Sequence, residues 1–296
     1  MFKFSAFNEY SIENLEKNQI WCNHYSAFND PFECWSIEHT GIPDPYKEKN
    51  RYQSVVEAWG YDPGPDNYDE FREYCSEFDN EYAMRVSYFT DSARISCFCK
   101  EINNLLMWSH YADGLRGFCI GFNKNLIVHS SSSADVFNVI YGKQPVVIDS
   151  MVYEVVKDQI WYHEMAIEEE LSSRKYLKNY KPDISLPEYK KALKQSRQLH
   201  FQMYFKMLCH KPIEWRYEKE IRLIYHSESE NLEGEPYQYP ASAIKSIYIG
   251  EKATDKNVDK LLSVLEKQKL DVPIYMARRN RENYEILLEP LNQMTK

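Results

Sequence analysis

Glycine is scarce in this sequence of 296 residues, with only 9 copies against 24 tyrosines and 14 phenylalanines. Neither G-x-G-x-x-G nor G-x-x-x-x-G-K-[ST] occurs. These two patterns form the loops that bring backbone N–H groups close to a bound phosphate. Their absence excludes a Rossmann dinucleotide fingerprint and a Walker loop, so any nucleotide site has to be built in another way.

Long apolar runs and regularly spaced cysteines are also missing. No stretch approaches the ~18 apolar residues of a membrane span, and no apolar run typical of a signal peptide follows Lys3. The 7 cysteines share no repeated spacing, and no second pair with zinc spacing accompanies Cys97 and Cys99. We therefore expect a cytoplasmic protein with reduced thiols, no membrane association and no bound metal.

An excess of positive charge is absent too. The formal net charge is -9, from 36 Lys and Arg against 45 Asp and Glu. An acidic surface repels phosphate backbones, so broad nucleic-acid binding is not expected. The best local basic patch is formed by Arg278, Arg279 and Arg281.

The sequence does contain the apolar content of a globular protein, at 43%. Its pattern predicts strands and helices in a mixed α+β order, with one domain over 1–296. A helical insertion or cap is expected at 35–93 and a helical insertion at 151–210. The main predicted strands are 94–100, 116–122, 136–141, 214–225 and 243–250, and the main predicted helices are 103–113, 151–180, 187–210 and 255–269.

The segment WRYEKEIRLIY at 215–225 alternates like a half-buried strand. Its polar side then contains Arg216, Glu218, Glu220 and Arg222. One interpretation is a solvated face with cross-strand ion pairs. Another is the floor of an active site. A third uses the two carboxylates with Lys211 as a divalent-metal site of a nuclease.

The segment FNDPFE at 28–33 has the pattern of a helix start. Asp30 suits the N-cap, Pro31 the first helical position and Glu33 a capping box. This pattern alone explains the segment structurally. A helix start at Asn29 and Asp30 would also point free N–H groups at an anion such as a pyrophosphate.

The segment MWSHYADGLRG at 107–117 combines core spacing with polar groups. Trp108 and Ala112 are four residues apart, as in a buried helix face. The geometry disfavours a Ser-His-Asp triad, because Ser109 and His110 point in different directions on one helix. His110 is either a structural histidine or a ligand contact.

Together these motifs resemble a widespread bacterial family of unknown function. The resemblance covers most of the chain outside 35–93 and the helical insertion. Its motifs correspond here to Phe2 to Phe4, Ile20 to Cys22, Asn29 to Glu33, Cys97 and Phe98, Met107 to Ala112, Gly117 to Phe122, and Trp215 to Ile224.

The order of elements also resembles the ADP-ribosyltransferase superfamily, especially the nucleic-acid-modifying toxins of bacterial conflict systems. The matching stretches are IENLEKNQIW and EIRLIY followed by AIKSIYIG. This resemblance implies a mixed, mostly antiparallel split sheet with helical insertions, and NAD as the substrate. These transferases usually have Arg or His on the first strand, where this chain has Lys3, which binds phosphate only as a point charge.

The same resemblance implies roles for individual residues. Glu220 would be the catalytic glutamate and Glu218 its support. Tyr111 or Trp108 would stack on nicotinamide. The contacts to NAD would then come from Lys3, Asn29, Asp30, Trp108, His110, Tyr111, Arg116 and Arg222, of which Lys3, Arg116 and Arg222 are the candidates for holding the pyrophosphate.

We therefore expect an NAD-consuming enzyme, acting as a toxin or phage-defence effector on nucleic acid, protein or water, with a neutralising partner protein as a candidate partner. Two alternatives remain open. One is a metal-dependent nuclease using Asp30, Glu33, Glu218 and Glu220. The other is a non-catalytic sensor or regulatory module, for which the many tyrosines would suit a recognition surface.

Overall fold

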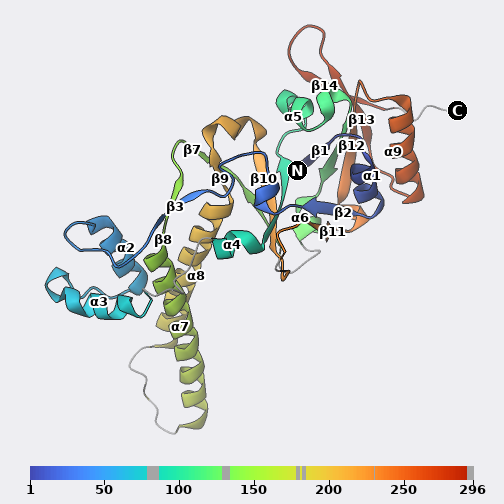
Figure 1. The fold of residues 1–296 in the computed structure, drawn as a ribbon. Helices are drawn as coiled ribbons and strands as arrows, with labels where there is room; N and C mark the ends of the chain where they lie inside the picture. The colour runs from blue at the N-terminus through green and yellow to red at the C-terminus, as the bar shows by residue number, and fades with distance from the viewer. Residues whose placement is uncertain (79–86, 129–133, 178–180, 182–184, 230, 292–296) are drawn as a thin grey trace. The chain divides into compact units, whose positions relative to one another are not determined.

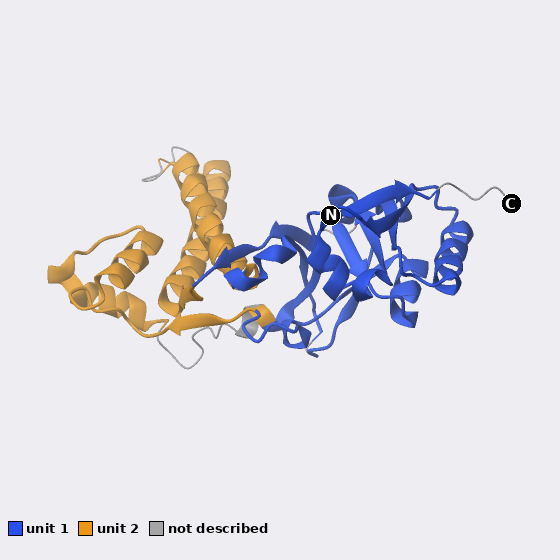
Figure 2. Ribbon diagram, turned by 90° about the horizontal axis from the view of Figure 1, so that it is seen from above, with its two compact units in different colours: residues 1–33, 91–143, 211–296 blue, residues 34–90, 144–210 orange. Residues whose placement is uncertain are grey.

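The computed structural model of the chain describes residues 1–78, 87–128, 134–177, 181, 185–229 and 231–291. The chain divides into two compact units, coloured separately in Figure 2. Unit 1 consists of residues 1–33, 91–143 and 211–296, and unit 2 of residues 34–90 and 144–210. The predicted insertions 35–93 and 151–210 therefore fall largely in unit 2.

Unit 1 contains most of the strands, labelled in Figure 1. Its strands are β1 (Phe2–Ser5), β2 (Gln19–Cys22), β4 (Ala93–Cys99), β5 (Phe118–Phe122), β6 (Ala134–Asn138), β7 (Ile140–Gly142), β10 (Glu220–His226), β11 (Glu235–Gln238), β12 (Ile244–Gly250), β13 (Ile274–Arg279) and β14 (Ile286–Pro290). Its helices are α1 (Glu9–Glu16), α5 (Leu105–His110), α6 (Lys124–Val128) and α9 (Asp255–Lys267), with short 3-10 helices at Tyr25–Ala27, Asp113–Leu115, Ile213–Glu218 and Ala241–Ala243.

Eight of these strands form one sheet in the order β14-β13-β12-β5-β1-β4-β10-β6. The β12–β13 pair is parallel and the other neighbouring pairs are antiparallel. The prediction of an α+β fold with a mixed, mostly antiparallel sheet is confirmed. Helix α9 packs its buried Leu261, Val264 and Leu265 into the same core as Ile247 and Ile249 of β12, because these residues recur at helical spacing.

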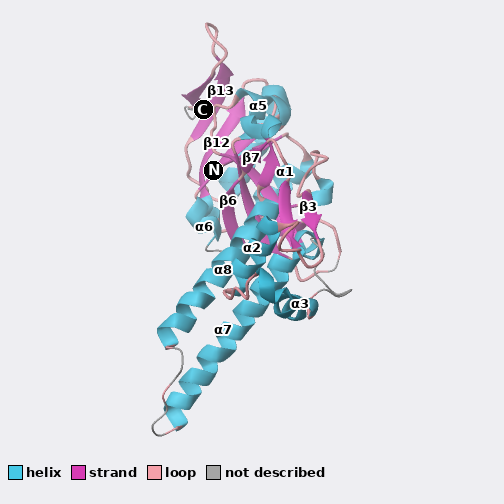
Figure 3. Ribbon diagram, turned by 90° about the vertical axis from the view of Figure 1, so that its left-hand side faces the viewer, coloured by secondary structure: helices cyan, strands magenta, loops and turns pink. Residues whose placement is uncertain are grey.

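Unit 2 is mainly helical. Helices α7 (Ser150–Tyr176) and α8 (Leu186–Leu208) run side by side in Figures 1 and 3. Its remaining elements are β3 (Ser36–His39), α2 (Lys49–Trp59), a 3-10 helix at Pro65–Asn67, α3 (Tyr68–Ser76) and β8 (Val146–Asp149), with β3 and β8 paired in parallel. The short elements α4 (Ser87–Ser92) and β9 (His210–Pro212) span unit boundaries.

Three predicted elements are wrong in part. The strand expected at 136–141 is two strands, since β6 ends at Asn138 and β7, which begins at Ile140, pairs with β9 in another sheet. The strand expected at 214–225 begins only at Glu220, because Ile213–Glu218 form a 3-10 helix that ends at Lys219, a left-handed residue with φ of 45°. The helix expected at 103–113 is shorter, since α5 ends at His110 and a 3-10 turn follows. The segment SSSS at 130–133, whose composition predicts a loop, lies outside the described residues.

No helix within the described ranges is both long enough and apolar enough to cross a membrane.

Candidate functional site

The large sheet of unit 1 is open between two of its neighbouring strands. Strand β1 pairs with β5 at all four of its residues, but its recorded pairing with β4 is the single position Phe2 opposite Cys99. Beyond that point Asn23, just after β2, exchanges two backbone hydrogen bonds of 2.8 Å with Ile95 of β4. A cavity of about 320 Å³ lies at this opening, lined by β1, β4 and the end of β2.

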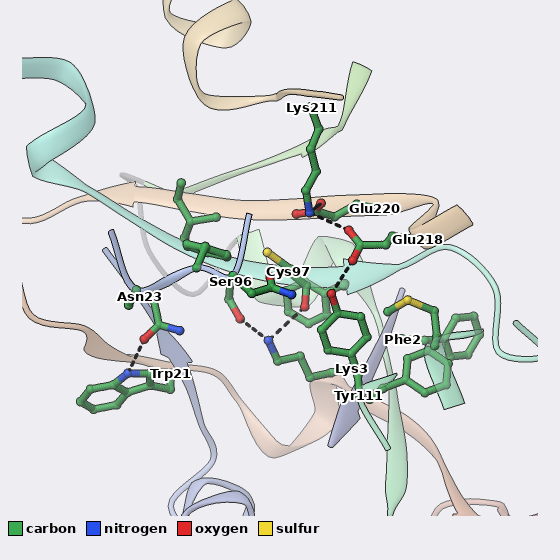
Figure 4. Close-up of a pocket in the computed structure, with 17 residues that line it drawn as sticks. Phe2, Lys3, Trp21, Asn23, Ser96, Cys97, Tyr111, Lys211, Glu218 and Glu220 are labelled. Carbon is green, nitrogen blue, oxygen red and sulfur yellow. Dashed lines mark hydrogen bonds and ion pairs between the residues drawn. The ribbon is translucent and has the colours of Figure 1, made fainter. Parts of the chain in front are cut away.

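Three buried charges stand at one end of the cavity (Figure 4). Lys211 Nζ lies 2.7 Å from Glu218 Oε2 and 3.1 Å from Glu220 Oε2. The three side chains are only 2–4% exposed. They come from different elements, because Glu218 ends the 3-10 helix, Glu220 begins β10 and Lys211 lies in β9. The turn at Lys219 therefore delivers two carboxylates to one ammonium group.

Arg222 extends this cluster away from the cavity. Its Nε lies 2.8 Å from Glu220 Oε1 and its Nη1 lies 2.6 Å from Glu33 Oε1. Arg222 is fully buried and does not line the cavity. A buried guanidinium needs such carboxylate partners, because an uncompensated buried charge is strongly destabilising. Both oxygens of Glu220 are thus fixed by cations.

The two glutamates differ in acidity. Burial raises the pKa of Glu218, and the nearby Lys211 only partly offsets that rise. Burial would also raise the pKa of Glu220, but Arg222 and Lys211 outweigh it and lower that pKa to about 2. Burial opposes the charge of Lys211, yet Glu220 and Glu218 hold its pKa above the ordinary value. Near neutral pH Glu220 is an anion, Lys211 is a cation, and Glu218 is the group closest to titrating.

Tyr111 and Lys3 approach the cavity from its other sides, as Figure 4 shows. The Tyr111 hydroxyl donates a short hydrogen bond to Glu218 Oε1. Burial raises the pKa of Tyr111, and its bond to Glu218 raises it further, so the phenol stays protonated. Lys3 Nζ donates to Ser96 Oγ at 2.8 Å and to the Cys97 carbonyl oxygen at 3.0 Å. Lys3 therefore bridges β1 and β4 across the opening.

The structure brings together five of the predicted site residues around this cavity, namely Lys3, Asn29, Tyr111, Glu218 and Glu220. The three motifs that contain Asn29, Tyr111 and Glu220 thus share one cavity, although they are far apart in the sequence. The assignment of Glu218 and Glu220 to a solvated strand face is wrong, because both side chains are buried.

The other predicted site residues lie elsewhere. Trp108 is fully buried in a core cluster and its Nε1 donates to the Ile102 carbonyl oxygen at 2.7 Å. Its indole is therefore not available to stack on a ligand. His110 is exposed, and Arg116 is 59% exposed and faces Asp113 at 3.9 Å. Neither lines the cavity, and Arg222 is committed to Glu220 and Glu33.

The helix predicted to start at Asp30 is absent. Residues 31–34 form a turn, in which Asp30 Oδ1 accepts from the Phe32 N–H at 2.9 Å. Glu33 pairs with Arg222 rather than closing a capping box, because that distant guanidinium offers a stronger partner. Asp30 is buried and does not line the cavity, so no helix N-terminus is directed at an anion there.

Sequence reasoning gave no substrate role to several lining residues, among them Lys211, Trp21, Asn23 and Cys97. Lys211 was predicted only as a member of a divalent-metal site in the nuclease hypothesis. Its actual position between two carboxylates depends on long-range strand pairing, which no local pattern reveals. Trp21 lies in β2 and Asn23 directly after it, and their alternation with the buried Ile20 and Cys22 was the available signal.

The carboxylates are not arranged as a metal site. Among the residues that the structure describes, no group of three or more His, Cys, Asp or Glu side chains has suitable geometry. The space between Glu218 and Glu220 is occupied by the Lys211 ammonium group, which supplies the positive charge that a divalent cation would bring. This arrangement disfavours the nuclease hypothesis, which needs those two oxygens as ligands.

Part of the chain matches the model of a known family. Residues 107–223 match the model of a family described as "Protein of unknown function (DUF2971)". The predicted resemblance to a family of unknown function is confirmed over this segment, which contains Tyr111, Lys211, Glu218 and Glu220. No curated protein and no solved structure matches the chain.

Proposed function

We propose that the protein consumes NAD, cleaving its nicotinamide–ribose bond and transferring ADP-ribose to an acceptor, as an ADP-ribosyltransferase or an NAD glycohydrolase. The observation that carries the proposal is Glu220, a buried carboxylate at the end of a cavity in an opened sheet, held ionised by Lys211 and Arg222. The opening between β1 and β4 also suits the split sheet expected of the ADP-ribosyltransferase fold.

Glu220 would act on the charge that develops during bond cleavage. When the C1′–N bond breaks, its electron pair moves to the pyridinium nitrogen and neutral nicotinamide leaves. Positive charge then develops on C1′ and the ring oxygen of the ribose. A fixed anion stabilises that charge most effectively where water is excluded, because it needs no reorganisation. Glu220 is 2% exposed and meets this requirement.

Glu218 would serve the second half of the reaction. An attacking water or hydroxyl oxygen forms the new bond to C1′ and has to lose its proton. The raised pKa of Glu218, caused by its burial, makes this carboxylate a better base than an exposed one. Tyr111 and Lys211 hold its two oxygens in place. The proton then passes from Glu218 to solvent, and the site returns to its initial state.

The rest of the cavity would hold the substrate. Lys3 is a point charge for the pyrophosphate, and it lies beside Phe98 at 5.4 Å from the ring centre. Phe2, Phe4 and Tyr111 provide aromatic walls for nicotinamide, in place of the buried Trp108. This assignment keeps Lys3 as the pyrophosphate cation and leaves Arg116 and Arg222 out of that role.

The molecule that accepts the ADP-ribose group can be identified by experiment. Nucleic acid, protein and water are the three candidates, and a toxin or phage-defence role with a neutralising partner protein fits an enzyme that depletes NAD. Purified protein incubated with NAD and each candidate acceptor separates them by mass spectrometry. A mass gain equal to ADP-ribose identifies a modified macromolecule, whereas free ADP-ribose identifies hydrolysis.

The decisive variant is Glu220→Gln, which keeps the shape of the side chain and removes its charge. We expect nicotinamide release to fall by at least about 100-fold, the scale of losing one electrostatic group at a transition state. Glu13→Gln is the matched control, because Glu13 is 49% exposed and pairs with the neighbouring Lys17 on the surface. Wild-type release by a folded Glu220→Gln protein would refute the assignment.

A further inference from the structure

A second cavity in unit 1, of about 280 Å³, adjoins the first. The two cavities share Lys3, Trp21 and Asn23 in their walls. The second is built from α1, β2 and β5, and its base is formed by the apolar side chains Phe118 and Ile120. Ile120 is the register partner of Lys3, and Phe118 is the partner of Ser5, so this base lies on the Lys3 face of the sheet.

The lining of the second cavity is polar but almost uncharged. Lys3, at the junction, is its single charged residue within the described part of the chain. Asn14 Oδ1 accepts from Gln19 Nε2 at 2.8 Å, and its amide nitrogen has no hydrogen bond to a described residue. The hydroxyl groups of Ser5 and Tyr239 likewise make none within the described ranges. Neutral donors and acceptors over an apolar base favour a flat heteroaromatic ligand over a second phosphate.

Trp21 stands where the two cavities meet and is well fixed. Its Nε1 donates to Asn23 Oδ1 at 3.0 Å, and a Cβ on Gly234 would collide with the Nε1 edge of the same indole. Trp21 nevertheless stays 44% exposed, and Tyr10, which lines the second cavity, is 78% exposed. A fixed, exposed indole beside a neutral polar cavity is suited to stack on a nucleobase.

We propose that the second cavity is a nucleobase site that takes the second nucleoside of the dinucleotide. The nucleobase would stack on Trp21. Asn14 and Tyr239 would contact the polar edge of the nucleobase, and Lys3 would hold the phosphates between the two nucleosides. The identity of the dinucleotide as NAD rests on the proposed function. The affinity for a single nucleobase is independent of the proposed function, because it follows from the lining of the second cavity alone.

The test measures binding of AMP by calorimetry, separately from NAD consumption. Trp21→Ala should weaken AMP binding by about tenfold, because the base loses its stacking partner. Trp161→Ala, which removes a 62% exposed indole from α7, is the matched control and should leave AMP binding unchanged. Gly234→Ala should displace the Trp21 ring and weaken AMP in the same direction.

Steady-state kinetics give the second readout. In Trp21→Ala the KM for NAD should rise about tenfold while kcat changes little, because the reacting groups are untouched. Nicotinamide mononucleotide, which lacks the second nucleoside, should bind wild type and variant equally. Thermal melting checks that each variant is folded.

The outcomes separate the two proposals. Equal AMP affinity in folded wild type, Trp21→Ala and Gly234→Ala overturns the nucleobase site, even if NAD is consumed. Trp21-dependent AMP binding without NAD turnover supports the nucleobase site and refutes the enzymatic function. Trp21-dependent AMP binding with a raised KM for NAD supports both.

Discussion

The interiors of the two units differ in kind. The core of unit 2 is apolar and aromatic, built around residues such as Tyr52, Val55, Phe71 and Ile148. Unit 1 has an apolar core as well, but it also buries the ion pairs of Lys211 and Arg222 beside a cavity. Hydrophobic residues of similar volume often replace such pairs without loss of stability. The interior of unit 2 is thus mainly a packed apolar core, whereas unit 1 also buries a charged cluster, to which the proposed function gives a catalytic role.

Ion pairs do occur in unit 2, but they have a local role there. Arg51 pairs with Asp149 at 2.6 Å and with Glu48 at 2.6 Å, and its side chain remains partly exposed. Asp149 is also the N-cap of α7, accepting from the N–H groups of Met151 and Val152. These charges fix helix ends. The cluster around Glu220 fixes two carboxylates at a cavity instead.

The largest effect on stability is expected for Lys211→Met, which removes the central cation of the buried cluster in unit 1. Removing the ammonium group leaves Glu218 and Glu220 buried together, which should lower the free energy of unfolding by about 3 kcal/mol. Chemical denaturation measures the loss. Lys157→Met is the control from unit 2, since Lys157 is half exposed and pairs with Glu154 at 3.1 Å, and it should cost less than about 1 kcal/mol.

A second substitution checks the cause of that loss. Lys211→Met combined with Glu218→Gln removes the repulsion and should recover part of the stability. If Lys211→Met alone is as stable as wild type, the buried charges do not form the coupled cluster described above.

A smaller effect is expected in the pH dependence of NAD consumption. Glu218 has to be ionised to accept a proton, and its pKa is raised by burial, so activity should rise with pH through that raised value. Below it, the rate should change tenfold per pH unit, equivalent to about 1.4 kcal/mol. Glu220, with a pKa of about 2, stays ionised throughout. A pH–rate profile of kcat/KM measures this limb.

The variant Glu218→Gln makes the test specific. It should lower the maximal rate and flatten the acid limb, because the titrating group is gone. An unchanged limb in this variant would assign the titration to another residue.

The smallest effect is expected for a conservative substitution in the core of unit 2. Ile148→Val removes one methylene from a side chain that is 2% exposed, and it should destabilise the protein by about 1 kcal/mol. The KM for NAD and the affinity for AMP should stay within about twofold of wild type, less than 0.5 kcal/mol. Calorimetric melting and kinetics at 25 °C measure both. If the Ile148→Val protein is fully folded but binds NAD less tightly, unit 2 contributes to NAD binding as well as to packing.

Elements with strong periodicity were predictable from the sequence. The helix expected at 255–269 is α9, and the one expected at 187–210 is α8, because capping and apolar spacing act locally. The strand at 214–225 failed in its first half, since the alternation of Trp215 and Tyr217 mimics a strand although a left-handed Lys219 interrupts it. One residue of backbone geometry leaves no trace in a hydrophobic pattern.

The charged cluster was only half predictable. Glu218 and Glu220 were conspicuous in the sequence, but a pattern of charges does not tell which elements cover it. Both pair with the buried Lys211, and Glu220, unlike Glu218, lies in β10, the strand that pairs with β4 and β6. The second cavity was not predicted, although Asn14 and Trp21 in its lining belong to the stretch IENLEKNQIW, because that stretch was interpreted only as a short helix and strand.

Lys3 has a final consequence for the mechanics of the sheet. Its two hydrogen bonds to Ser96 and Cys97 tie β1 to β4 where backbone pairing has stopped. An anion that captures this ammonium group competes with those bonds. The two hydrogen bonds of Lys3 stabilise the contact between β1 and β4, and breaking them costs free energy that lowers the affinity for an anion. By linkage, a bound anion weakens the contact between β1 and β4 by the same free energy. Binding of an anion to Lys3 and the tie between β1 and β4 are therefore thermodynamically coupled.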